Sequence, residues 1–159
     1  KGEWLPADRH TETIAVRDAM FDPFEYLWAR YKGGLLRTDF TRKLGKISYH
    51  VPCHLRVQNM GLRTREMLKL VPGTEVTTVE RCSGHDGTWG VKKEFFATSM
   101  KIGKPVFRQM ASTQPDYVAS DCPIAGRRIV QGIEGQQEGH MRGRKEHPLT
   151  LLRMAYGIQ

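Results

Sequence analysis

The sequence contains no long run of apolar residues. A membrane-spanning helix needs about 20 of them in succession, and no apolar stretch approaches that length. The first residues also lack the basic segment, apolar run and cleavage site of a secretory signal. We therefore expect a soluble domain in the cytoplasm. Because the chain begins at Lys1 and not at methionine, we expect it to be a piece of a longer protein or a processed product.

Cysteine is scarce, and its number is odd. The chain has three cysteines, Cys53, Cys82 and Cys122. An odd number in a chain without a secretory signal argues against a disulfide framework. We expect free, ligating or catalytic thiols in a reducing compartment.

Acidic residues are outnumbered by basic ones. The chain has 25 lysines and arginines against 17 acidic residues, which gives a formal net charge of +8. Such an excess can serve a nucleic acid, an anionic membrane surface or an acidic partner protein. No nucleic-acid-binding motif with interleaved aromatic residues is present, so we expect no nucleic acid partner. A length of 159 residues with 39% hydrophobic content suits one compact domain.

Strand-like and helix-like segments alternate along the chain. Short runs of β-branched and aromatic residues predict strands at residues 47–51, 74–79 and 116–120. Apolar spacing predicts helices at residues 22–34, 62–71, from 88 onward with a break at 103–105, from 123 through 130, and at 149–157. This alternation predicts an α/β fold, in which βαβ units form a parallel sheet with helices on its faces.

Two regions stand apart from this pattern. We expect residues 1–37 to form an N-terminal arm with an aromatic helix around Trp28 that packs on the cysteine-bearing domain of residues 38–159, although such a helix face can also dock on a partner or a membrane. No period is visible in residues 1–17, which predicts a loop. The segment 132–148 is rich in glycine and carries Arg142, Arg144 and Lys145, so it is predicted to be an exposed basic loop.

The three cysteines follow the three predicted strands. Each lies a few residues past a strand and shortly before a helix, where the helix dipole and free backbone amides favour a thiolate. Parallel strands share one carboxyl edge, so the sulfurs of Cys53, Cys82 and Cys122 can converge there and bind zinc or an iron-sulfur cluster. The alternative, that they are buried structural thiols, stays open, because free cysteine is often buried as a small hydrophobe.

A fourth ligand would come from nearby. His85 is the preferred candidate, since two residues separate it from Cys82 and both side chains can then face one ion. His54 directly follows Cys53, and adjacent side chains often point apart. Gly84 and Gly87 would let the backbone approach a cluster closely. A surface or hydrogen-bonded role remains the alternative for His85, and the more so for His50 and His54.

A different chemistry also matches part of the sequence. Arg128 follows Cys122 by six residues at a strand-to-helix turn, as in a cysteine-dependent phosphatase. Three features oppose this hypothesis. Pro123 removes one phosphate-binding amide, Ile129 stands where a hydroxyl residue would assist the leaving thiolate, and the other two cysteines have no role.

Three stretches carry a resemblance to a known family. They are Tyr49–Asn59, Arg81–Gly90 and Ser120–Ala125. Together they resemble the cysteine-rich domain of heterodisulfide reductase-related iron-sulfur proteins. That family has one cysteine, then Cys-Cys-Gly, then Cys-x-x-Cys, and Cys53, Cys82 with Gly84, and Cys122 match it. Ser83 and Ala125 stand in place of the two remaining cysteines.

The resemblance implies an electron-transfer domain. The resemblance implies that Cys53, Cys82 and Cys122 bind a [4Fe-4S] cluster or, alternatively, zinc. The absence of the two other family cysteines disfavours a noncubane cluster. The domain would relay electrons from a flavin dehydrogenase subunit toward quinone or a related acceptor, without catalysing a reaction alone. A peripheral position at the cytoplasmic membrane face is a further expectation. A zinc-stabilised module that joins subunits without redox chemistry is the alternative.

Overall fold

The computed structural model describes residues 9–135 and 143–158. The chain divides into two compact units, residues 1–36 and 37–159. In the described part of the chain, no helix combines the length and apolar character needed to span a membrane.

The first unit contains two helices, α1 (His10–Ala19) and α2 (Pro23–Lys32). The predicted helix at 22–34 is confirmed as α2, which Asp22 caps by accepting a hydrogen bond from the Phe24 amide at 2.9 Å. The prediction of a loop across residues 1–17 is wrong for residues 10–17, which belong to α1, and residues 1–8 lie outside the described part. None of the residues of α1 is buried, so no apolar periodicity marks this helix in the sequence.

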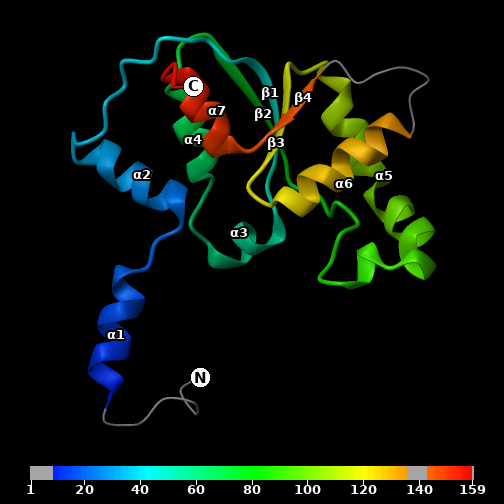
Figure 1. The fold of residues 1–159 in the computed structure, drawn as a ribbon, viewed down its shortest axis with the longest axis horizontal. Coiled ribbons are helices and arrows are strands. Elements are labelled where there is room, and N and C mark those ends of the chain that lie inside the picture. The colour runs from blue at the N-terminus through cyan, green and yellow to red at the C-terminus, as the bar shows by residue number, and fades with distance from the viewer. Residues whose placement is uncertain (1–8, 136–142, 159) are drawn as a thin grey trace. The chain divides into compact units, whose positions relative to one another are not determined.

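The second unit is built on a parallel four-stranded sheet, which confirms the predicted fold class (Figure 1). Its order is β2-β1-β3-β4. The strands are β1 (Gly45–His50), β2 (Thr74–Val79), β3 (Tyr117–Ser120) and β4 (Arg144–Glu146). The helices are α3 (Cys53–Gln58), α4 (Arg63–Lys69), α5 (Phe96–Ser112), α6 (Pro123–Glu134) and α7 (Pro148–Ala155).

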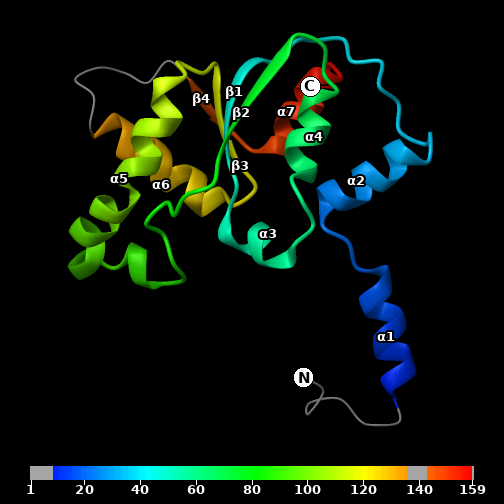
Figure 2. The ribbon, with the colours of Figure 1, turned by 180° about the vertical axis from the view of Figure 1, so that it is seen from behind.

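Helices cover both faces of the sheet. Helices α5 and α6 lie on one face, and α4 and α7 lie on the other, as the two opposite views show (Figures 1 and 2). Alternate residues of the central strand β1 therefore face different layers. The Ser48 hydroxyl lies 3.3 Å from the Met110 sulfur on α5, whereas the neighbouring Tyr49 reaches the side of α4.

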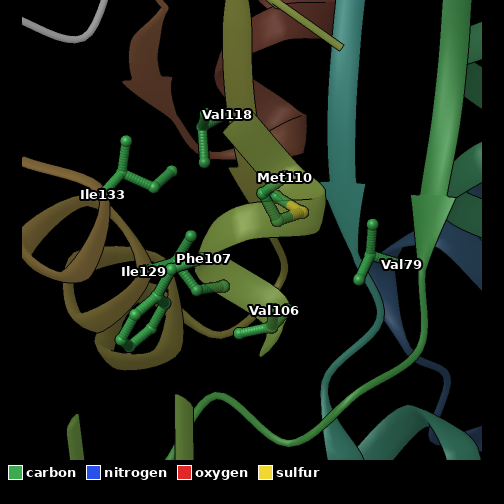
Figure 3. Packing of buried hydrophobic residues seen from close by; sticks show 7 residues of the cluster. All are labelled: Val79, Val106, Phe107, Met110, Val118, Ile129 and Ile133. Atoms are coloured by element: carbon green, nitrogen blue, oxygen red, sulfur yellow. The ribbon is translucent and has the colours of Figure 1, made fainter. Parts of the chain in front are cut away.

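The main hydrophobic cluster lies between the sheet and the pair α5–α6 (Figure 3). Its members are Val79, Val106, Phe107, Met110, Val118, Ile129 and Ile133, each at most 2% exposed. Strands β2 and β3 and both helices contribute to it. This packing holds α5 and the second half of α6 against the sheet.

The predicted exposed loop at 132–148 is wrong in its outer parts. Helix α6 continues to Glu134, and residues 144–146 form the edge strand β4, which pairs with β3 from Tyr117 opposite Arg144. Three consecutive charged residues form this strand, a composition typical of short edge strands. Arg142 lies outside the described residues.

The predicted helix break at 103–105 is also wrong, because α5 runs unbroken through Gly103 and Pro105. Gly103 is a site of close packing, since a Cβ there would overlap the ring of Phe107 and lie 2.7 Å from the Ser83 carbonyl oxygen. Pro105 is exposed, so the backbone carbonyl that loses its donor can bind water. The predicted helical start at Thr88 is two 3₁₀ turns, Trp89–Val91 and Lys93–Phe95, separated by the extended Lys92.

Candidate metal centre

The three cysteines lie at the carboxyl edge of the sheet, just beyond the ends of three adjacent strands. His50, the last residue of β1, is in register with Val79 of β2 and Ser120 of β3. Cys53 and Cys82 each follow these positions by three residues, and Cys122 follows by two. Neighbouring strands lie about 4.8 Å apart, so the three loops leave the sheet side by side.

The thiols differ in exposure. Cys53 and Cys82 are exposed and Cys122 is partly exposed, and all three are free. The alternative that they are buried structural thiols is therefore wrong. Cys53 is the first residue of α3, and Cys122 is the N-cap of α6, where the helix dipole favours negative charge.

The structure does not bring these sulfurs into a closed coordination shell. Within residues 9–135 and 143–158, no group of three or more histidine, cysteine or acidic side chains is placed to hold a metal ion. The three thiols therefore lie at one edge of the sheet, but in this structure they are not arranged around a common ion. In donor chemistry they fit a soft metal or a cluster, and their ligation by one centre stays a prediction.

Two of the sulfurs receive hydrogen bonds from local donors. The Arg56 guanidinium donates to the Cys53 sulfur at 3.2 Å, and the Gly84 amide donates to the Cys82 sulfur at 3.4 Å. Donors of this kind surround ligating sulfur atoms in metalloproteins and tune the centre that they hold. Both donors lie within three residues of the sulfur that they contact.

His85 has an unpaired nitrogen. Its Nε2 is buried and has no hydrogen-bond partner within the described residues. Buried polar atoms normally have a partner, so this nitrogen is available to bind a ligand. This agrees with the donor set expected for a metal, although His85 is not grouped with two other ligands in the described part of the chain.

Gly84 packs tightly against α5, and its approach to a cluster stays a prediction. It has a φ of +75°, and a Cβ at this position would overlap the carbonyl oxygen of Ser99 and lie 3.0 Å from the Gly103 amide nitrogen. The close approach is therefore to the backbone of α5. The Ser99 hydroxyl donates to the Gly84 carbonyl at 2.6 Å, which fixes the loop after Cys82 on this helix. Around Gly87, by contrast, a Cβ would meet nothing within 4 Å.

Beneath the edge, His50 connects the three cysteine-bearing segments. Its Nε2 lies 2.8 Å from the Arg81 carbonyl oxygen, and its Nδ1 lies 3.1 Å from the Ser120 hydroxyl. A carbonyl can only accept, so we assign the proton to Nε2, and Ser120 then donates to Nδ1. The Ser120 oxygen in turn accepts from the Cys122 amide at 3.4 Å. His50 therefore links β1, the residue before Cys82 and the residue before α6.

Burial also determines the charge of His50. The ring is 1% exposed. Burial lowers the pKa of His50 and the Arg56 guanidinium lowers it further, while the hydrogen bond to the Arg81 carbonyl acts in the opposite direction. The neutral ring is the form that this site stabilises. No local pattern in the sequence indicates this role, because the two partners of His50 lie 31 and 70 residues away.

Asp121 joins the same edge to the opposite layer. Its carboxylate accepts hydrogen bonds from the hydroxyls of Tyr49 and of Thr64 on α4, and its carbonyl oxygen lies 3.2 Å from His147 Nε2. Tyr49 and Thr64 are at most 1% exposed. The residue between β3 and Cys122 is thus held by hydrogen bonds on the side of the sheet that α4 and α7 cover.

The arrangement required by the phosphatase hypothesis is absent. Arg128 lies on α6, nearly two helical turns beyond Cys122, and is 6% exposed. Its guanidinium donates to the Gly90 carbonyl and to Gln131, and it lies 5.0 Å from the Phe96 ring centre. Arg128 therefore fixes the 3₁₀ turns against α6 and does not form a phosphate cradle with Cys122.

Comparison with known proteins places this edge in a family. Residues 47–124 match the family model described as "Cysteine-rich domain" (CCG). The matched segment contains all three cysteines and His85. No solved structure gives a significant match.

Two curated relatives share similarity with nearly the whole chain. Each is named as a subunit of anaerobic glycerol-3-phosphate dehydrogenase, one from Escherichia coli strain K12 and one from Escherichia coli O157:H7. Each is 40% identical over 152 residues, which cover 94% of this chain and 36% of the relative. The chain thus spans about a third of the length of these relatives. The segment of residues 47–124, which contains the cysteine-bearing edge, is therefore a CCG cysteine-rich domain.

Proposed function

We propose that this protein is an electron-transfer domain of an iron-sulfur oxidoreductase subunit. The observation that carries the proposal is the position of three free, accessible thiols just beyond the carboxyl ends of three adjacent parallel strands of a CCG domain. The similarity to a dehydrogenase subunit supports a redox role. Electrons would pass from a flavin dehydrogenase subunit through the centre to a quinone or a related acceptor.

The two absent family cysteines favour a centre with few ligands. Ser83 and Ala125 stand at those positions, and each is 4% exposed. The remaining donors are Cys53, Cys82, Cys122 and the unpaired His85 nitrogen. Three sulfurs and one imidazole suit a cubane [4Fe-4S] cluster, whose irons need one protein ligand each.

A zinc-stabilised module that joins subunits is the second candidate. The same donor set favours it, because three cysteines and one histidine form a common structural zinc site. Such a module would contain one zinc ion per chain and no reducible chromophore.

The metal content of protein purified without oxygen tests the proposal. We expect iron and acid-labile sulfide, a visible absorption that bleaches on reduction, and an electron paramagnetic resonance signal of the reduced cluster. Zinc alone would support the second candidate, and protein with neither metal would contradict both.

Substitution of the cysteines identifies the ligands. We expect Cys53→Ser, Cys82→Ser and Cys122→Ser each to reduce the bound metal about tenfold or more, because one bond to the metal is lost. His85→Ala should also lower it, whereas His54→Ala serves as the matched control and should retain it, since His54 is an exposed neighbour of Cys53. Wild-type metal content in any one of the three serine variants would exclude that cysteine as a ligand.

A further inference from the structure

A basic groove crosses α5 beside the loop that leads to Cys82. It has a volume of about 540 Å³ and is lined by Arg81, Lys101, Lys104, Pro105, Arg108, Gln109 and Ser112. Four of these lining residues are cationic, and none of the seven is acidic. We call this surface the α5 groove.

The cations of the α5 groove are not neutralised by ion pairs in the part of the chain that the structure describes. In the described residues, none of Arg81, Lys101, Lys104 and Arg108 belongs to a salt bridge. Glu80 precedes Arg81 in the sequence but does not line the groove. Like charges at this spacing repel one another, so an acidic ligand would relieve an unfavourable arrangement.

The groove is a long stripe and not a small pocket. Lys101, Lys104, Arg108 and Ser112 follow one another at intervals of three or four residues on the face of α5 opposite the core residues Val106, Phe107 and Met110. From Lys101 to Ser112 this stripe extends for about 16 Å. All of the lining residues are exposed, and an exposed stripe of this length suits several spaced carboxylates better than one small anion.

We infer that the α5 groove is the docking site for a partner protein with an acidic surface. An acidic protein is favoured over single-stranded nucleic acid, because the seven lining residues include no aromatic side chain to stack on bases. It is favoured over a membrane, because Pro105 is the sole apolar residue among those seven.

The position of the groove would connect docking to the metal centre. Arg81 lines the groove and directly precedes Cys82, whose α-carbon is therefore about 3.8 Å away along the chain. Its carbonyl oxygen is also the acceptor for His50. That the docked partner is the electron donor rests on the proposed function, whereas the docking itself does not.

Charge reversal in the full chain tests the inference. The probe is a fluorescent peptide of about ten residues that alternates glutamate and alanine, and binding is measured by anisotropy. We expect the double variant Lys104→Glu/Arg108→Glu to weaken binding about tenfold or more, and added salt to weaken wild-type binding. The control Lys69→Glu/Arg153→Glu makes the same change of charge on exposed residues of α4 and α7, on the other face of the sheet, and should bind within about twofold of wild type.

Equal weakening in the two double variants would overturn the inference, because net charge alone would then explain binding. Tighter binding of inorganic phosphate, of a single-stranded oligonucleotide or of phosphatidylglycerol vesicles through Lys104 and Arg108 would also overturn it. Metal content is measured on the same samples. Loss of peptide binding in Lys104→Glu/Arg108→Glu, with the metal content of wild type, supports docking at the α5 groove. Wild-type protein that binds the peptide but contains no metal contradicts the proposed function alone.

Discussion

Replacement of Gly84 by alanine is expected to destabilise the protein by about 3–5 kcal/mol. Two effects combine at this residue. Its φ of +75° disfavours a side chain, and the new methyl group would overlap the Ser99 carbonyl oxygen. Backbone cannot rotate away as a flexible side chain can, so the loop after Cys82 would have to leave α5. Urea unfolding of both proteins at neutral pH measures the difference in the free energy of unfolding.

Gly61→Ala is the matched control. Gly61 has the same φ of +75°, but a Cβ there would meet nothing within 4 Å. We expect it to cost about 1–2 kcal/mol, the contribution of the backbone conformation alone. Equal costs for the two variants would show that contact with Ser99 is unimportant.

Replacement of His50 by leucine is expected to lower the free energy of unfolding by about 2–4 kcal/mol at pH 7.5. The variant would leave the partly buried Arg81 carbonyl without its donor and the buried Ser120 hydroxyl without its acceptor. His50→Gln, whose amide can reach one of these partners, should recover part of the loss. His54→Leu is the control, and it should change stability by at most about 0.5 kcal/mol because His54 is exposed.

The substitution His50→Leu should also alter the dependence of stability on pH. Because the folded protein lowers the pKa of His50, the unfolded chain binds more protons at this residue, and stability falls as the pH decreases. The decline begins near the ordinary histidine pKa of about 6.5 and ends below the folded pKa. The free energy of unfolding, measured from pH 7.5 to 5, should therefore fall less in His50→Leu than in wild type. Parallel curves for the two proteins would show that His50 does not contribute to the decline.

The sheet could be predicted where strand signals are local. The segments 47–51, 74–79 and 116–120 are rich in apolar and β-branched residues, and each precedes a helical pattern, so their parallel arrangement follows from general rules. Strand β4 carries no such signal. Its three charged residues form a strand because they pair with the open edge of β3. The paired residues are distant in sequence, since Arg144 lies opposite Tyr117, 27 residues earlier in the chain.

The sequence predicted at which edge of the sheet the cysteines lie, but it did not predict the hydrogen bonds that support this edge. Cysteine positions after strands indicated the correct edge, since every βαβ unit ends there. The support beneath it depends on distant residues. Hydrogen bonds join His50 to Ser120, Asp121 to Thr64 and Arg128 to Gly90. No spacing in the sequence indicates these pairs.

Glycine was the residue type whose role was hardest to predict. Gly103 suggested the end of a helix, whereas it lies inside α5 because the Phe107 ring and the Ser83 carbonyl occupy the space of a side chain. Gly84 suggested a close approach of the backbone to a cluster, and the approach that the structure shows is to Ser99 of α5. In both cases the neighbour that occupies the space of a side chain became evident only in three dimensions.

The central position of β1 has a consequence for how the protein matures. Its partner residues on β3 follow about 70 positions later, with Ser120 opposite His50. Until a nascent chain has emerged beyond Cys122 and that pairing has formed, the third sulfur is not beside the other two. An inorganic centre bound by all three can therefore be inserted only after translation of this region, so a ribosome-stalled chain that ends before β3 should not acquire it.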